Sequence, residues 1–238
     1  MRQIVIPGLV CPSDGNGTVP TGASSANHAI SNYRHNGGPI GLGGGSNPQC
    51  PCGTNYNSFR PRAGVGNPNW TSTFNEGASP VSSASPSGCF HRNGVMIQAD
   101  GTRVKLAQIK LKDVTDGLSS TILYGESRWE CSGQARISWA NSQAFDRTNT
   151  LVPINYDSCI YGSNNADALA KAQAQGKTGC EASNNWKTER GFKSQHPGVI
   201  TVTMADGSVH TIAETADHFL FNRLGCRGDQ LVAGVGSL

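Results

Sequence analysis

The sequence predicts an α+β domain in which an antiparallel β-sheet packs against helices. Two β-hairpin patterns, each centred on an Asp-Gly pair, predict the sheet. A near-helical spacing of apolar residues close to the C-terminus predicts a helix beside the second hairpin. At 238 residues the chain is long enough to bury a core of its own, and we expect residues 1–238 to form a single domain.

The first 90 residues contain few regular patterns. Residues 3–10 alternate weakly between apolar and polar side chains and end at Cys11-Pro12, which predicts a short edge strand because proline is tolerated there. Residues 13–88 are rich in Gly, Asn, Pro and Ser, which predicts a long insertion of loops. We expect disulfides to tie this insertion down, either as a surface excursion or as a surface that recognises a partner.

Three elements are predicted in the middle of the chain. Short apolar runs at 95–97 and 104–106 flank Asp100-Gly101, which predicts the first hairpin. Residues 119–126 follow a turn and predict a buried strand. The alanine-rich segment 167–175 predicts a short helix that ends near Gly176.

The second hairpin is the clearest element of the sequence. Residues 199–204 alternate between apolar and polar or small side chains before Asp206-Gly207, a pair typical of two-residue turns. A two-residue turn would pair Met204 with Val209, so that both side chains lie on one face of the sheet. A C-terminal helix closed by Gly225 is then predicted from the spacing of Ile212, Ala216, Phe219, Leu220 and Leu224.

Composition excludes several classes of protein. Charged residues make up 15% of the chain, against roughly 25% in an average domain, and the 30 glycines indicate many loops. The net charge is only +3 and the 19 basic residues are scattered, so nothing indicates a nucleic-acid partner. The sequence has no run of about 18 apolar residues, so we expect no membrane contact by this part of the protein.

Cysteine usage predicts disulfides. Cys50-Pro51-Cys52 is the only close pair, and a one-residue gap is poor spacing for zinc ligands. An even number of cysteines in a loop-rich chain is typical of an oxidising, extracytoplasmic compartment. The connectivity stays open among the eight candidates, which are Cys11, Cys50, Cys52, Cys89, Cys131, Cys159, Cys180 and Cys226.

Calcium is the only cofactor for which the sequence offers candidate ligands. Asp14 and Asn16 alternate with glycine, and Asp113 lies near Asp116 in a second loop, so both segments carry the oxygen ligands that calcium prefers. Neither segment is a complete EF-hand. Asp and Asn occur in turns more often for backbone reasons, so we prefer that structural explanation and keep calcium as the alternative.

No recognised sequence frame for catalysis occurs. His196 and Asp206 could form a base with an orienting carboxylate, but an extended strand would separate them by roughly 33 Å. We therefore expect both to be structural, with Asp206-Gly207 in the turn and His196 ahead of the strand, and we expect no enzyme. Aromatic residues that could stack on sugars, or serve as core anchors, are Tyr33, Trp70, Trp129, Trp139 and Trp186.

Five short motifs, in their order along the chain, resemble one bacterial protein family. They are Cys11-Pro12-Ser13-Asp14, Ser31-Asn32-Tyr33, the segment 116–126, His196 followed after nine residues by Asp206-Gly207, and the segment 224–232. The chain is similar to the pilin-like proteins catalogued as domain of unknown function 1559, most of whose known members come from planctomycetes. Together the motifs are spread over nearly the whole length of the chain, from residue 11 to residue 232.

The resemblance implies a pilin-like head domain. Such proteins begin with a prepilin-type leader and a long hydrophobic helix, and this chain starts at the segment that follows them. We therefore expect a non-enzymatic, extracytoplasmic head of a type IV pilin or type II secretion pseudopilin, with other pilin-like subunits or cell-surface components as partners and anchoring through that helix. The alternative is an extracellular carbohydrate- or solute-binding module.

Overall fold

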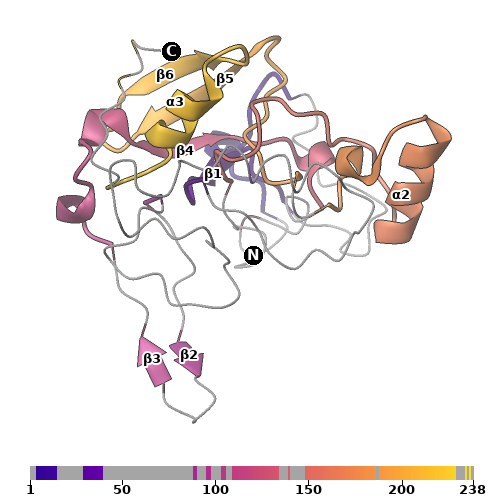
Figure 1. The fold of residues 1–238 in the computed structure, drawn as a ribbon, viewed down its shortest axis with the longest axis horizontal. Coiled ribbons are helices and arrows are strands. Elements are labelled where there is room, and N and C mark those ends of the chain that lie inside the picture. Colours follow the sequence, from indigo (N-terminus) through magenta and orange to yellow (C-terminus); the bar gives the residue numbers. More distant parts are fainter. Residues whose placement is uncertain are drawn as a thin grey trace.

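The structure is a computed structural model that describes residues 4–14, 29–39, 88–89, 95–97, 103–105, 109–133, 139, 148–185, 188–228, 234 and 236. Its main feature is a four-stranded antiparallel sheet in the order β1-β4-β5-β6 (Figure 1). The strands are β1 (Tyr33–His35), β4 (Ile122–Glu126), β5 (Val199–Met204) and β6 (Val209–Ala213). The predicted α+β class with an antiparallel sheet is confirmed.

The C-terminal hairpin forms as predicted, but its register differs by one residue. Thr203 pairs with Val209, and Gly207 donates its N–H to the carbonyl of Met204 at 3.0 Å. Three residues therefore make the turn, and Gly207 takes the positive φ of 88° that such a loop requires. Met204 is buried whereas Val209 is 63% exposed, so the prediction that they share a face is wrong.

The N-terminal prediction is also wrong. Residues Pro7–Leu9 form a 3₁₀ helix instead of an edge strand, because Pro7 fixes a helix-compatible φ and has no N–H to contribute to a ladder. The edge of the sheet is occupied by β1, which lies inside the segment 13–88 for which loops are predicted. Residues 15–28 and 40–87 of that segment lie outside the described residues.

The core lies on one face of the sheet. Alternate residues of β5 point into it, and the ring of Phe192 contacts the ring of Phe221 edge-on with centroids 5.9 Å apart. Burial of this apolar surface contributes the main favourable free energy of folding. The buried cluster consists of Ile122, Ile154, Phe192, Ile200, Val202, Met204, Ile212, Phe221 and Leu224.

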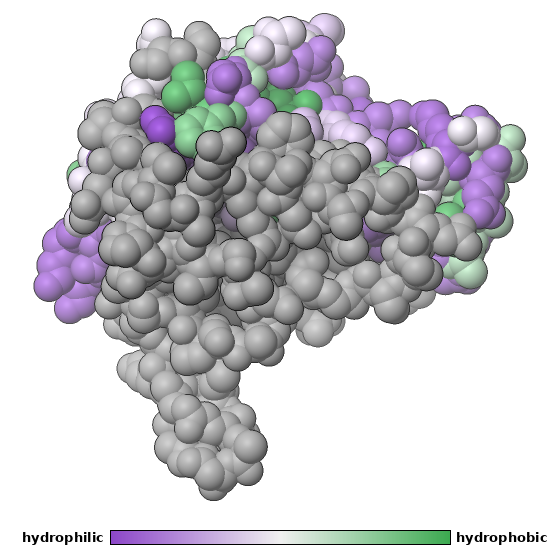
Figure 2. Space-filling model, viewed as in Figure 1, coloured by the Kyte–Doolittle hydropathy of each residue, from purple (hydrophilic) through white to green (hydrophobic). Residues whose placement is uncertain are grey.

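Two α-helices are present among the described residues. α2 (Asn165–Ala174) begins after Asn164, whose side chain accepts the N–H of Asp167, and the chain leaves it through Gly176 at a φ of 68°. This confirms the predicted helix. Hydrophilic residues cover much of α2 on the face seen in Figure 2.

α3 (His218–Leu224) lies beside β5 and contributes Phe221 and Leu224 to the core (Figure 1). It is shorter than its apolar spacing predicted, because Ile212 belongs to β6 and the side chain of Asp217 caps the first turn by accepting the N–H of Leu220 at 2.9 Å. Its C-terminal cap is Gly225, as predicted.

The remaining elements are short. The predicted first hairpin is confirmed by the antiparallel pair β2 (Val95–Ile97) and β3 (Arg103–Lys105), which lies apart from the four-stranded sheet (Figure 1), whereas its Asp100-Gly101 turn lies outside the described residues. Further 3₁₀ helices span Leu111–Asp113, Leu118–Ser120, Trp129–Cys131 and Gly179–Glu181. Within the described part of the chain, no helix is both long and apolar enough to cross a membrane.

Candidate metal centre

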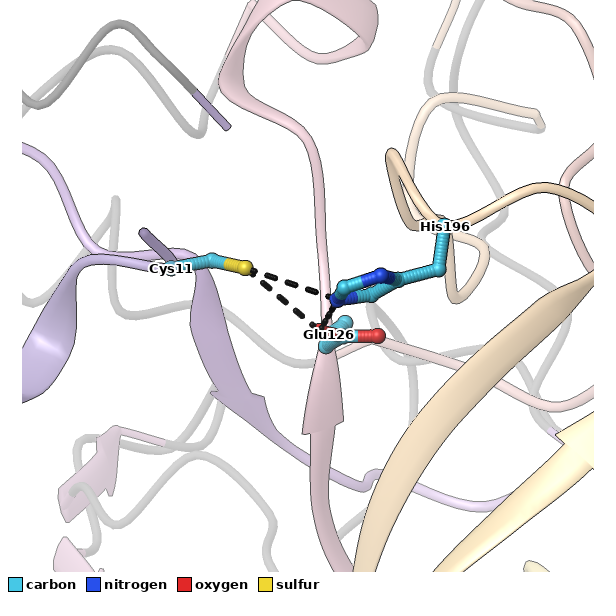
Figure 3. Close-up of side chains that lie close together, drawn as sticks. All are labelled: Cys11, Glu126 and His196. Atoms are coloured by element: carbon cyan, nitrogen blue, oxygen red, sulfur yellow. Dashed lines mark hydrogen bonds and ion pairs between the residues drawn. The ribbon is translucent and has the colours of Figure 1, made fainter. Parts of the chain in front are cut away.

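Three side chains from distant parts of the chain meet at one point (Figure 3). The Sγ of Cys11 lies 3.8 Å from Nε2 of His196 and 3.8 Å from Oε1 of Glu126. The same Oε1 lies 3.6 Å from Nε2 of His196. Thiol, carboxylate and imidazole atoms thus form a nearly equilateral triangle, a grouping that can hold a metal ion.

Cys11 is positioned by the segment after the N-terminal 3₁₀ helix. Its backbone N–H donates to Oδ1 of Asn32 at 3.0 Å, and the backbone N–H of Asn32 donates to the carbonyl of Leu9 at 2.8 Å. The amide nitrogen of Asn32 also donates to the carboxylate of Asp14. One side chain therefore holds the Cys-Pro-Ser-Asp segment against the start of β1.

Glu126 is the last residue of β4, and its two carboxylate oxygens have separate roles. Oε2 accepts the backbone N–H of Thr201 in β5 at 2.8 Å, so the carboxylate is oriented while Oε1 faces the other two side chains. The carboxylate is almost completely buried, with 4% of its side chain exposed. A buried carboxylate requires paired or coordinating partners, and the cluster supplies them.

His196 lies just before β5. Its backbone N–H donates to Oγ of Ser194 at 3.0 Å, and Gly198 then turns the chain into the strand with a φ of 74°. The imidazole is 39% exposed, whereas Cys11 is buried. The cluster is therefore closed on the side of the sheet and open to solvent at the imidazole.

Tyr33 borders the cluster. It pairs directly with Glu126 in the register of β1 and β4, which places both side chains on the same face of the sheet. The pKa of the Tyr33 phenol is raised, first by burial and then by the charges of Cys11 and Glu126. The phenol therefore lies within electrostatic reach of both groups.

The geometry does not match a nucleophilic triad. In such a triad the nucleophile and the orienting carboxylate bond to different nitrogens of the imidazole. Here Sγ and Oε1 both approach Nε2, so the carboxylate does not orient the ring for attack by the thiol. Three donors around one point are instead the arrangement of metal ligands.

The two parts of the signature, His196 and Asp206-Gly207, have separate roles in the structure. Asp206 accepts the N–H and the hydroxyl of Ser208 at 2.8 and 2.7 Å, and these bonds lower the pKa of its carboxyl group. Asp206 and Gly207 therefore form the turn, as predicted. For His196 the sequence predicted only a position ahead of β5, and it did not reveal the cluster with Cys11 and Glu126.

The predicted calcium ligands have other partners. Oδ2 of Asp113 accepts the N–H of Lys110 at 2.8 Å, and the backbone N–H of Asp116 donates to the carbonyl of Arg227 at 3.3 Å. Asp14 is buried and bonded to Asn32, and burial raises the pKa of its carboxyl group. Asn16 lies outside the described residues. The carboxylate of Asp113 thus bonds to the backbone, and that of Asp14 to a neighbouring side chain.

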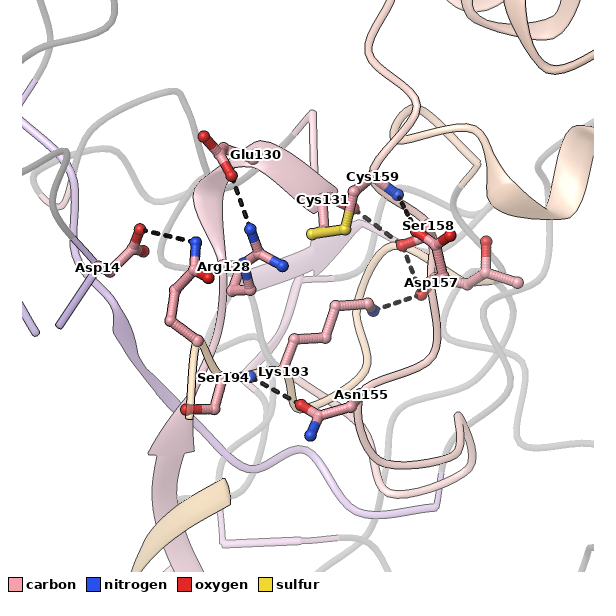
Figure 4. Close-up of a disulfide and its surroundings, with 12 residues drawn as sticks. Asp14, Arg128, Glu130, Cys131, Asn155, Asp157, Ser158, Cys159, Lys193 and Ser194 are labelled. Carbon is pink, nitrogen blue, oxygen red and sulfur yellow. Dashed lines mark hydrogen bonds and ion pairs between the residues drawn. A yellow bond between two sulfur atoms is a disulfide. The ribbon is translucent and has the colours of Figure 1, made fainter. Parts of the chain in front are cut away.

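The cysteines do not all form disulfides, contrary to the prediction. Cys131 and Cys159 are bonded (Figure 4), and Cys180 is also in a disulfide. Cys11 and Cys89 are thiols, and burial raises the pKa of Cys89 to about 11. Cys226 is a thiol as well, whose Sγ donates to the carbonyl of Asn222 at 3.4 Å. Cys50 and Cys52 lie outside the described residues.

Two of the tryptophan candidates for sugar binding are described and half-buried. Trp139 donates its indole N–H to the carbonyl of Ile4 at 2.8 Å, which makes it an anchor for the N-terminal segment. Trp129 begins a 3₁₀ helix. Trp70 and Trp186 lie outside the described residues.

The sequence does contain an indication of the cluster, although the spacing between the motifs does not reveal it. Cys11, Glu126 and His196 each belong to one of the five short motifs, and each is a residue type that binds metals. Spacing alone could not join them, because 115 residues separate Cys11 from Glu126 and 185 separate it from His196. Only the pairing of β1 with β4 and of β4 with β5 brings the motifs together.

Comparison with known proteins assigns the chain to a family. Residues 2–218 match the family described as protein of unknown function (DUF1559). Since the match spans far more than half of the chain, the protein belongs to this family. All three residues of the cluster lie inside the matched region, whereas most of α3 follows it. No curated protein and no solved structure matches the chain.

Proposed function

We propose that this chain is the extracytoplasmic head domain of a pilin-like or pseudopilin-like protein, and that it acts in filament assembly or surface presentation without catalysing a reaction. Its partners would be other pilin-like subunits or components of the cell surface. Its attachment would be made by a hydrophobic N-terminal helix of the full-length protein. The proposal rests on the resemblance of the five motifs to pilin-like proteins.

The use of the motif residues supports this proposal best. Asn32 and Glu126 bond to backbone N–H groups of neighbouring segments, and Asp206 bonds to the N–H of Ser208 within its own turn, so the motifs stabilise a rigid sheet. A domain that serves as a building block needs such rigidity, whereas an enzyme needs a nucleophile beside an oriented base. Sγ of Cys11 and Oε1 of Glu126 approach the same nitrogen, Nε2 of His196. This arrangement argues against an enzyme of that kind.

The disulfide between Cys131 and Cys159 supports the proposed extracytoplasmic location. Disulfides form and persist in oxidising compartments and are rare in the cytosol. Cys131 and Cys159 enclose a segment that contributes Thr148–Thr150 to contacts with β1 and its flanks, so the bond stabilises the region around the sheet. An exported head domain would need this stabilisation outside the cell.

Immunogold electron microscopy of cells that express the full-length protein tests the proposal. Antibodies against the chain should label filaments or the outer surface, and fractionation should recover the protein outside the cytoplasm. Gold confined to the cytoplasm would overturn the proposal. A purified chain that binds one class of glycan on an array, without any assembly, would replace it with the solute-binding alternative.

A further inference from the structure

We propose that Cys11, Glu126 and His196 form a zinc site that fastens the N-terminal segment to the sheet. The three ligand atoms are Sγ, Oε1 and Nε2, and they come from the segment after the first 3₁₀ helix, the end of β4 and the approach to β5 (Figure 3). Zinc binding would serve a filament subunit and a binding module equally, so the site is tested independently of the proposed function.

The spacing of the ligand atoms fits a single zinc ion. A tetrahedral ion with Zn–S of about 2.3 Å and Zn–N or Zn–O of about 2.0–2.1 Å requires S···N and S···O separations of about 3.5 Å and an N···O separation of about 3.4 Å. The observed separations are 3.8, 3.8 and 3.6 Å. Each exceeds the requirement by only a few tenths of an ångström, so small side-chain adjustments suffice to seat the ion.

The chemistry of the donor set selects zinc over calcium. Calcium takes six to eight oxygen ligands, whereas this site offers one sulfur, one nitrogen and one oxygen atom. Thiolate, imidazole and carboxylate together are typical of zinc. Since the imidazole is 39% exposed, solvent reaches the site, and water would supply the fourth ligand of a tetrahedral ion.

The surroundings of the site hold the ligands in place before the metal arrives. The N–H of Thr201 fixes one oxygen of Glu126, and Oδ1 of Asn32 accepts the N–H of Cys11. Partners of this kind orient metal ligands and raise affinity. Cys11 is outside any disulfide, so its sulfur can bind zinc as a thiolate, although the same protein forms disulfides elsewhere. Zinc would also protect this thiol from oxidation.

Zinc titration of the purified, chelator-treated chain tests the site. We expect about one zinc ion per chain by elemental analysis after dialysis, and a rise in the unfolding temperature that grows with free zinc concentration. Substitution by Co²⁺ should give a thiolate-to-cobalt charge-transfer band, because Cys11 is a ligand. Calcium alone should leave the unfolding temperature unchanged.

Variants separate this site from nonspecific binding. His196→Gln should fold, because its side chain is partly exposed, and should weaken zinc binding by at least about tenfold. Cys11→Ser should remove the cobalt charge-transfer band. The matched control is His210→Gln, which changes a histidine of β6 outside the cluster and should bind zinc as the wild type does. Absence of zinc binding in the wild type, or equal affinity in His196→Gln, would overturn the site.

Discussion

Gly125 lies in β4 directly against the ring of Phe192, and its replacement by alanine should be strongly destabilising. It pairs with Arg34 of β1 and with Val202 of β5, so it occupies an interior strand. A Cβ atom at this position would lie 2.5 and 2.6 Å from two ring carbons of Phe192 and 3.1 Å from a methyl group of Val202. Nonbonded carbons are normally about 3.5–4.0 Å apart, so the ring would have to move by about 1 Å.

The surroundings of Phe192 leave little room for that movement. The ring is fully buried and packs edge-on against Phe221. Overpacking of a dense core typically costs 1–3 kcal/mol, and we expect Gly125→Ala to cost about 3 kcal/mol because the clash involves two atoms of an enclosed ring. For a chain of this size, that loss corresponds to a fall in Tm of about 6–12 °C.

Thermal and chemical unfolding of Gly125→Ala measure this cost. Gly8→Ala is the matched control, since a Cβ there would meet no atom within 4 Å, and its stability should stay within about 0.5 kcal/mol of the wild type. Phe192→Leu provides room near the new methyl group, so the double variant should lose at least about 1 kcal/mol less than the sum of the single variants. Equal stability of the two alanine variants, or additive losses in the cycle, would refute the reasoning.

Three further perturbations test other parts of the fold. Gly207→Ala should cost about 1–2 kcal/mol of stability because an L side chain is strained at a φ of 88°. Gly207→Asn should cost less, because asparagine tolerates this conformation better. Equal losses of the two variants in denaturant unfolding would contradict the turn geometry. Burial lowers the pKa of Lys193 from 10.5 to about 7, so the unfolded chain binds more protons above pH 7 and the contribution of this lysine to stability should rise with pH, by up to about 1.4 kcal/mol per pH unit. Lys193→Met should remove this rise from the unfolding free energies measured between pH 6 and 9, and an unchanged pH profile would show that the amine is not desolvated. Replacing Cys131 and Cys159 by alanine opens a disulfide with a sequence separation of 28 and should cost about 3–4 kcal/mol in non-reducing denaturant unfolding; a loss below about 1 kcal/mol would mean that the unfolded chain is already constrained there.

Local sequence patterns were sufficient for the elements that depend on neighbouring residues. Alternation before Asp206-Gly207 indicated the hairpin, and an alanine-rich run before Gly176 indicated α2. Both succeed because side-chain period and turn chemistry act within about ten residues. The predicted register of this hairpin was wrong by one residue. The sequence does not distinguish a two-residue turn from the three-residue turn that Gly207 closes.

Pairing between segments that are distant in the sequence decided the other features of the fold. Residues 33–35 have no strand pattern of their own, and they become β1 because β4 offers an open edge for hydrogen bonding. The tertiary fold likewise brings Cys131 and Cys159 together as partners, whereas Cys11 stays a thiol.

The sequence by itself therefore determined the α+β class, the hairpins, the helix α2 and the family. The tertiary structure decided the meeting of Cys11, Glu126 and His196, because side chains 115 and 185 residues apart come within ligand distance only after three chain segments have packed on one sheet. Short-range steric and hydrogen-bonding preferences depend only on residues that are close together in the sequence. A site assembled across the chain depends on the free energy of the whole fold.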